Sequence, residues 1–115
     1  MDISFNTKKL EKTFNEGRQL ETVHGAKRAR KIRIRMSEFR AAESLHDFWP
    51  PTGPPGRCHE LTEGKRNGQL SVDLYHPYRL IFVPDHNPIP VREEGGLNWS
   101  EVTAIKIIGV EDTHG

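Results

Sequence analysis

Histidine side chains are the clearest candidates for proton transfer in this sequence of 115 residues. An imidazole with an ordinary pKa of ~6.5 both accepts and donates protons near neutral pH, which suits it to acid and base roles. His59 and His114 lie at opposite ends of the C-terminal half, so only folding could bring them to one cleft. Each also has a structural interpretation, because strand histidines are often partly buried and a penultimate residue is often frayed.

Cationic side chains that could bind an oxyanion occur in three places. Lys65 and Arg66 fall in a glycine-flanked turn, and Arg79 stands among apolar residues of an expected strand. A guanidinium suits planar oxyanions because its fork donates two parallel hydrogen bonds. A structural alternative is that Arg79 pairs with Asp73 and that the turn cations are simply solvated. The third place is a run of six cations with no acid between them, namely Lys27, Arg28, Arg30, Lys31, Arg33 and Arg35.

Other chemistries find little support in the residue pattern. The one cysteine, Cys58, directly precedes His59, and adjacent strand residues point to opposite faces, so the two do not form a nucleophile–base pair. Because no phosphate-binding glycine loop, dinucleotide fingerprint or coherent metal-ligand set is present, we expect neither a metal nor another cofactor. Net charge is only +1, yet residues 1–47 carry eleven Lys or Arg against seven Asp or Glu. This local excess permits a nucleic-acid surface on the first half.

The elements that must position these side chains begin with a short strand and two helices. Residues 3–5 alternate between apolar and polar, which predicts a strand. Thr7 could cap a following helix, whose narrow apolar stripe holds Leu10 and Phe14. A stronger helical pattern covers residues 26–45. Its expected buried face consists of Ala29, Ile32, Met36 and Phe39.

The second half of the chain has the alternation typical of β-structure. A proline-rich connector ends the helix, and a first run at residues 57–62 leads into a turn. Strands are expected at residues 70–75, 78–83 and 102–110, and the last is apolar on both faces, which places it inside the sheet. The order β-α-α-β-β-β predicts one α+β domain over residues 1–115, with two N-terminal helices packed on a mainly antiparallel sheet. No apolar stretch approaches a membrane span, so we expect a cytoplasmic protein.

Several of these segments, in their order and spacing, resemble the HigB-type toxins of the RelE/ParE superfamily, also described as the plasmid maintenance killer protein family. Residues 57–68 are similar to the family's histidine and leucine followed by a Gly-x-Arg-x-Gly hairpin. Residues 70–72 resemble a Trp-Ser-Ile strand in which leucine replaces the tryptophan, and residues 78–82 resemble a Tyr/Trp-Arg-Ile/Leu-x-Phe strand. Residues 110–114 resemble an Asp-Tyr-His ending, with Thr113 in place of the tyrosine.

This resemblance implies a RelE-like fold and a metal-independent endoribonuclease that cleaves messenger RNA on the ribosome. Attack by a 2′-hydroxyl needs a base, an acid and cations around the charged phosphorane. Asp112 could orient an imidazole, accept a proton or contact a base edge, and orientation is favoured because an ordinary aspartate is a poor acid at neutral pH. The implied site residues are His59, Asp112 and His114 for catalysis, and Arg79, Lys65 and Arg66 for the phosphate.

The cationic run would then dock on ribosomal RNA through phosphate contacts. It could instead accept an acidic antitoxin segment, or form the solvated flank of an amphipathic helix. The implied partners are a helix-turn-helix (HigA-like) antitoxin that binds operator DNA, the ribosome and messenger RNA, with no membrane. Two other functions stay open: a non-nucleolytic ParE-like toxin of a protein target such as gyrase, which would not need His59 and His114, and a catalytically idle regulatory module of a toxin–antitoxin operon.

Overall fold

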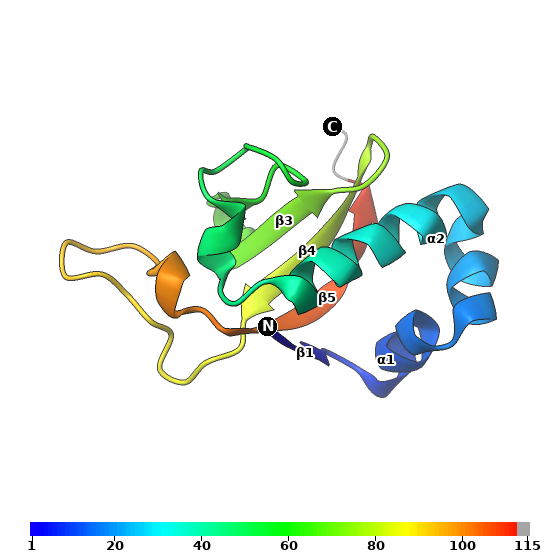
Figure 1. Ribbon diagram of the computed structural model, residues 1–115, viewed down its shortest axis with the longest axis horizontal. Coiled ribbons are helices and arrows are strands. Elements are labelled where there is room, and N and C mark those ends of the chain that lie inside the picture. The colour runs from blue at the N-terminus through cyan, green and yellow to red at the C-terminus, as the bar shows by residue number, and fades with distance from the viewer. Residues whose placement is uncertain (113–115) are drawn as a thin grey trace.

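The computed structural model describes residues 1–112 and has an α+β architecture with two helices and a mixed five-stranded sheet (Figure 1). The strands are arranged in the order β1-β5-β4-β3-β2. Strand β1 runs parallel to β5, whereas the other neighbouring pairs are antiparallel, so the expected mainly antiparallel sheet is confirmed. The elements are β1 (Asp2–Phe5), α1 (Lys8–Asn15), α2 (Gly17–Ala41), β2 (His59–Leu61), β3 (Gln69–Asp73), β4 (Tyr78–Pro84) and β5 (Ala104–Asp112).

Four strands follow the helices within the described residues, one more than the β-α-α-β-β-β order. The additional strand is β2, which forms inside the run at residues 57–62 and pairs with β3 at the edge of the sheet. Strand β5 lies between β1 and β4, which confirms its expected place inside the sheet. It begins at Ala104 and continues to Asp112, two residues later at each end than the sequence pattern predicts.

The N-terminal part of the helical layer is longer than expected. Thr7 caps α1 as predicted, because its hydroxyl oxygen accepts a hydrogen bond from the Leu10 amide at 3.1 Å. Helix α2, expected over residues 26–45, is already helical from Gly17. It bends at Gly25, where φ is 81°, a backbone conformation that a glycine adopts without the steric cost of a Cβ atom.

Helix α2 stops at Ala41, four residues before the predicted end. Leu45 lies instead in the short 3₁₀ helix η1 (Leu45–Phe48), which Ser44 begins by accepting a hydrogen bond from the His46 amide. The predicted apolar face of the helix is confirmed, since all of its members are buried, and these are Ala29, Ile32, Met36 and Phe39.

Aromatic packing fixes α2 against the sheet. The ring of Phe39 lies 5.0 Å from that of Phe82 on β4 and 5.2 Å from that of Phe48 in η1, measured between centroids. All three rings are nearly inaccessible to solvent, and each fully buried side chain of this kind stabilises the fold by roughly 1.5–3 kcal/mol. This layer therefore holds the helix across the strands that carry the candidate site residues.

The register of the strands decides which side chains share the second face of the sheet, the one turned away from α2. Residues opposite each other in a register point to the same side, as do residues two apart on one strand. His59 lies opposite Ser71, and Asp73 lies opposite Arg79. Since Ser71 and Asp73 are two apart, His59 and Arg79 project from the same face, with Glu111 opposite Arg79 on β5.

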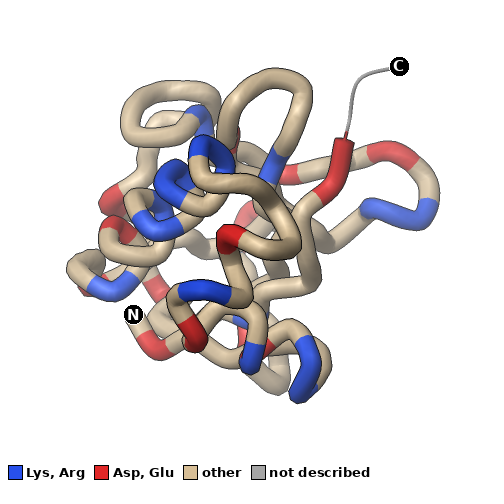
Figure 2. The backbone as a smooth tube through the Cα atoms, turned by 90° about the vertical axis from the view of Figure 1, so that its right-hand side faces the viewer, with Lys and Arg blue, Asp and Glu red and all other residues tan. Residues whose placement is uncertain are grey.

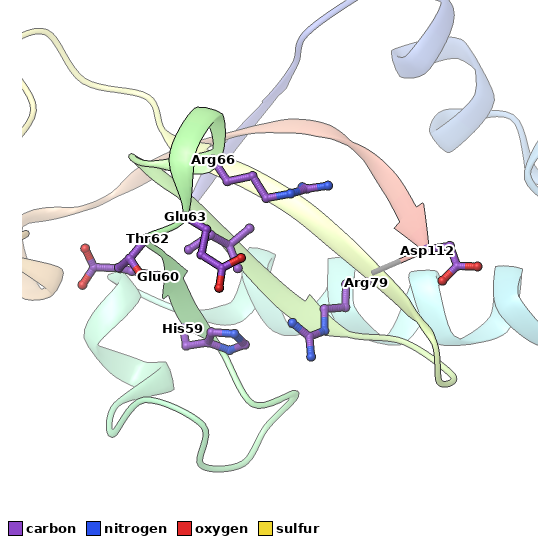
Figure 3. A pocket seen from close by; sticks show the side chains of 8 residues that line it. His59, Glu60, Thr62, Glu63, Arg66, Arg79 and Asp112 are labelled. Carbon is purple, nitrogen blue, oxygen red and sulfur yellow. The ribbon is translucent and has the colours of Figure 1, made fainter. Parts of the chain in front are cut away.

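The middle of this second face is covered rather than exposed. Strand β3 was expected to be half-buried, but Ser71 is as inaccessible as its apolar neighbours, and Ile81 beside it on β4 is fully buried. On the same face, Arg66 follows β2 and reaches across β3 and β4 to pair with Glu111 on β5. Its side chain lies over the sheet in Figure 3.

Two long connections pack on each other at the other end of the sheet. The connection between β4 and β5, drawn from yellow to orange in Figure 1, projects away from the strands. The indole of Trp99, at its C-terminal end, meets the ring of Trp49 edge-on at 5.2 Å. Ile89 and Val91 of the same connection are exposed.

Among the described residues, no helix combines the length and apolar character required to cross a membrane.

Candidate functional site

A cavity of about 420 Å³ opens on the second face of the sheet, between the edge strand β2 and the C-terminal end of β5 (Figure 3). It gathers four of the predicted site residues from four separate segments of the chain. Its walls are formed by His59, Glu60, Leu61, Thr62, Glu63, Arg66, Arg79 and Asp112.

His59 occupies one side of this cavity in a fixed ring orientation. Its Nδ1 lies 2.8 Å from the carbonyl oxygen of Arg57. A carbonyl oxygen only accepts hydrogen bonds, so Nδ1 must carry the proton and donate it. The other ring nitrogen, Nε2, is therefore the atom that exchanges a proton, and the neutral ring can act there as a base. In Figure 3 the imidazole extends from β2 toward the side chain of Arg79.

Arg79 faces His59 from β4 and is held by a carboxylate. Its Nε lies 3.4 Å from Oδ1 of Asp73, which confirms the ion pair that the sequence offered as the structural alternative. The ion pair leaves the guanidinium accessible from the cavity, because the Arg79 side chain is 31% exposed. Its terminal amino groups point into the space in front of His59 (Figure 3). The ion pair thus orients a cation toward the imidazole.

The two cations of the predicted turn are separated by the fold. The turn contains the 3₁₀ helix η2 (Gly64–Arg66), from which Arg66 points back over the sheet and lines the cavity. Its hydrogen bond with Glu111 raises its pKa further, so it stays charged. Lys65 is exposed and is not part of the cavity wall. Of the two cations, Arg66 therefore lines the cavity and Lys65 does not.

Asp112 is the last residue of β5 and the last described residue, and it lines the far end of the cavity. Its backbone is in register with Tyr78, and its carboxylate is directed away from His59 in Figure 3. This orientation gives it no direct contact with the imidazole of His59. His114, the proposed partner of Asp112, and Thr113 lie outside the described residues.

The electrostatics of the cavity are mixed. Glu63 contributes a carboxylate to its wall, against the guanidinium groups of Arg66 and Arg79. Glu60 and Asp112 also line the cavity, but their registers with Leu70 and Tyr78 direct their side chains to the α2 side of the sheet. Glu60 is partly occupied elsewhere, because its Oε2 accepts a hydrogen bond from the indole nitrogen of Trp99 at 3.3 Å. A polyanion would therefore gain little long-range attraction from the cavity itself. Attraction of that kind needs cations beyond its rim.

The cationic run supplies such cations along α2, where Figure 2 shows Lys and Arg positions on successive turns. Three of them lie on the tyrosines of the hairpin between β3 and β4. The guanidinium of Arg28 stacks 3.4 Å from the ring centre of Tyr78, while Lys27 and Lys31 lie 4.4 Å and 5.1 Å from that of Tyr75. These cation–π contacts bring the N-terminal half of the run beside the end of β5, since Tyr78 pairs with Asp112.

In the C-terminal half of the cationic run, two arginines are engaged in contacts within the protein. Arg35 is buried, and it donates to the carbonyl oxygen of Asp73 and to Glu38, so its expected role in docking is wrong. The cause is its position one turn from Ile32, on the side of α2 that meets the sheet. Arg33 is exposed but binds the carbonyl oxygen of Gly17 at 2.7 Å. Arg30 is exposed on the same helix.

Cys58 takes no part in the chemistry of the cavity. It is fully buried, whereas the neighbouring His59 is partly exposed, in agreement with the expected opposite orientations. Burial raises the pKa of its thiol to about 12, with a further contribution from the nearby charge of Glu60. The thiol is therefore protonated at neutral pH and is a poor nucleophile.

Sequence reasoning missed the acidic wall and a second hollow beside it. Glu60 and Glu63 gave no signal, because isolated charges in a short strand and turn are commonplace. The second hollow, about 120 Å³, lies on the other side of Arg79 and contains His76. A histidine followed by proline predicts a turn, so His76 was not among the candidate site residues, which came mainly from expected strands.

The sequence matches no known protein-family model, and it has no match among curated proteins. The residues of the cavity provide one oriented imidazole, two paired guanidiniums and the carboxylate of Glu63.

Proposed function

We propose that this protein is a HigB-type toxin that cleaves messenger RNA on the ribosome as a metal-independent endoribonuclease. One observation carries the proposal: the imidazole of His59 and the guanidinium of Arg79 face each other across a single cavity. Transfer of a phosphodiester to a neighbouring 2′-hydroxyl requires this pair of functions, a proton acceptor next to a cation. The α+β order and the positions of His59, Arg79 and Asp112 in the resembling motifs support the same reading.

In the proposed reaction, Nε2 of His59 takes the proton of the 2′-hydroxyl. The oxygen attacks phosphorus, the bond from phosphorus to the 5′-oxygen breaks, and the products carry a 2′,3′-cyclic phosphate and a 5′-hydroxyl. Arg79, and Arg66 behind it, stabilise the negative charge that builds up on the phosphorane oxygens. His114 is proposed to protonate the leaving oxygen, with Asp112 orienting its ring.

Docking on the ribosome is proposed to involve cations of α2 that are exposed or partly exposed. Lys27, Arg28 and Lys31 lie on Tyr75 and Tyr78 near the end of β5, on the α2 side of the sheet. The cavity opens on the other side, so a phosphate backbone bound to these cations would pass around this end of the sheet to reach His59. Contacts of this kind weaken with salt, because each neutralised phosphate releases counterions. The mixed charge of the cavity makes such an outer surface necessary.

The remaining features of the proposal follow from a toxin of this type. They are a RelE-like fold, action in the cytoplasm, and a cognate helix-turn-helix antitoxin that neutralises the toxin and binds operator DNA. The antitoxin could cover the same cations of α2 with an acidic segment. Growth arrest on expression, relieved by a neighbouring antitoxin gene, would be the cellular counterpart.

A translation reaction with purified components tests the proposal, with the 5′ ends of the messenger mapped with and without ribosomes. Wild-type protein is expected to produce ribosome-dependent cuts. His59→Gln and Arg79→Gln should each reduce the cutting rate by at least 10²-fold, the usual scale for loss of one acid–base or electrostatic group. His114→Ala tests the proposed acid in the same way.

Matched controls are available in the chain. His46→Gln changes an exposed histidine outside the cavity, and Arg92→Gln changes an exposed arginine of the loop between β4 and β5. Both controls should cut like wild type. Growth arrest with intact messenger would replace the proposal by a toxin of a protein target, and unimpaired translation with unimpaired growth would replace it by a regulatory module.

A further inference from the structure

The smaller hollow shares one wall with the cavity at His59. It has a volume of about 120 Å³ and lies at the end of the hairpin between β3 and β4. Arg79 is the only described residue that lines both spaces. The remaining walls are formed by Arg57, Asp73, Leu74, His76, Pro77 and Tyr78. This smaller hollow thus has two guanidiniums and an imidazole around one carboxylate, that of Asp73.

The carboxylate of Asp73 acts as a bridge between the two guanidiniums. Its Oδ1 lies 3.4 Å from Nε of Arg79, and its Oδ2 lies 3.4 Å from Nη1 of Arg57. One negative charge cannot neutralise two positive ones, so the trio keeps a net charge of +1. The Arg57 side chain is 61% exposed, which leaves its other donors accessible to a ligand.

Hydrogen bonds to the backbone of Asp73 hold the centre of this trio in place. Gly56 and Arg57 both have positive φ values, 73° and 54°, and the second is unusual for a residue with a side chain. The Gly56 carbonyl oxygen accepts a hydrogen bond from the Asp73 amide at 2.7 Å. Buried Arg35 donates from Nε to the Asp73 carbonyl oxygen at 2.8 Å. Both backbone groups of Asp73 are therefore anchored, and the strained backbone brings Arg57 over its carboxylate.

We propose that this smaller hollow is a phosphate-binding subsite for single-stranded RNA. Arg57 and Arg79 would bind the non-bridging oxygens of one phosphate group, with His76 as an additional donor at the rim. Two guanidiniums fixed by a shared carboxylate offer a preorganised set of donors for an oxyanion. Because Arg79 also borders the larger cavity, the bound phosphate would be the chain neighbour of the one beside His59. The assignment to RNA rests on the proposed function, whereas the binding of an oxyanion does not.

Titration of isotope-labelled full-length protein with inorganic phosphate tests the oxyanion site directly. The readouts are the Nε–H resonances of Arg57 and Arg79 and the ring resonances of His76, against sodium chloride at the same ionic strength. Saturable shifts at these three residues are expected. Arg57→Gln should weaken the apparent affinity about tenfold through the loss of charge-assisted hydrogen bonds, whereas Arg92→Gln should leave it unchanged. Absence of saturable shifts in the wild type would overturn the subsite.

A second titration uses a short single-stranded oligoribonucleotide with 2′-O-methyl groups, which cannot undergo attack by the 2′-oxygen. Shifts at Arg57 and Arg79 that compete with inorganic phosphate would support an RNA phosphate as the occupant. Phosphate binding without oligonucleotide binding would overturn that assignment. Neither measurement involves ribosomes or cleavage, so failure of the nuclease proposal and failure of the subsite are distinguishable. Because Arg57 is largely exposed, its glutamine variant should fold, and an unchanged amide spectrum elsewhere would verify this.

Discussion

Replacement of Arg35 by methionine tests how the helical layer holds the site. The side chain is 11% exposed, and the whole residue is 9% exposed, so water reaches little of it. Its Nε donates to the Asp73 carbonyl oxygen and its Nη1 to Oε1 of Glu38, both at 2.8 Å. Methionine keeps most of the apolar volume of the arginine stem but removes both donors. The Arg35→Met variant therefore isolates the polar contribution.

The expected magnitude follows from these two contacts. A hydrogen bond from a charged donor to the buried Asp73 carbonyl contributes about 1.5–3 kcal/mol. The pair with Glu38 adds at most about 1 kcal/mol, because the Glu38 side chain is 28% exposed and partly regains water. We expect the free energy of unfolding to fall by about 2–3 kcal/mol and Tm by roughly 10 °C.

Urea unfolding at pH 7, followed by the fluorescence of the buried Trp99, measures the change. Arg30→Met, an exposed arginine on the same helix, should change the free energy of unfolding by less than about 0.5 kcal/mol. A loss below about 1 kcal/mol for Arg35→Met, similar to that of the control, would refute the reasoning. It would mean that water or a rearranged side chain replaces the donors of Arg35.

Three further predictions follow from the packing. Gly56→Ala should reduce the free energy of unfolding by about 1–3 kcal/mol in the same urea assay, because φ is 73° and a Cβ would lie 2.9 Å from Nε of Arg35; a neutral result would contradict this account. The thiol of Cys58 should react with a thiol reagent only after unfolding, since burial raises its pKa to about 12; rapid reaction of the native protein would refute this. Burial, and secondarily Arg28, lowers the pKa of His24, so the unfolded chain binds its proton first and stability should fall as pH drops below about 6.5. His24→Gln should reduce this loss between pH 7.5 and 5.5, and an identical loss would locate the effect elsewhere.

The helical layer shows which parts of the fold follow from sequence periodicity. Ala29 and Phe39 were predicted to face the core because a helix that packs on a sheet repeats its apolar residues at three- and four-residue steps. The helical turns before Gly25 were not predicted, because a glycine in the sequence is compatible both with the end of a helix and with a bend inside one. Leu20 is buried in this segment, but one buried residue creates no periodicity.

The candidate site shows a sharper limit. The parity of each strand is visible in the sequence, but the register that places His59 and Arg79 on one face depends on pairing between distant strands. The pairing of Arg66 with Glu111 joins residues 45 positions apart, so no local pattern predicts it. The position of Arg57 depends on its positive φ. A proline- and glycine-rich segment is compatible with such a conformation, but its sequence does not show which residue adopts it. The predicted role of His114 lies outside the described residues and stays a prediction.

The central claim, that the cavity at His59 promotes attack by a 2′-hydroxyl, is tested most directly by the chemical ends of the cleaved messenger. Fragments made by ribosome-bound wild-type protein would be labelled at their 5′ ends by a kinase and analysed for a 2′,3′-cyclic phosphate. The account predicts 5′-hydroxyl and cyclic phosphate ends that disappear in His59→Gln and persist in His46→Gln. Fragments with 5′-phosphate ends, or equal cleavage by His59→Gln, would contradict it.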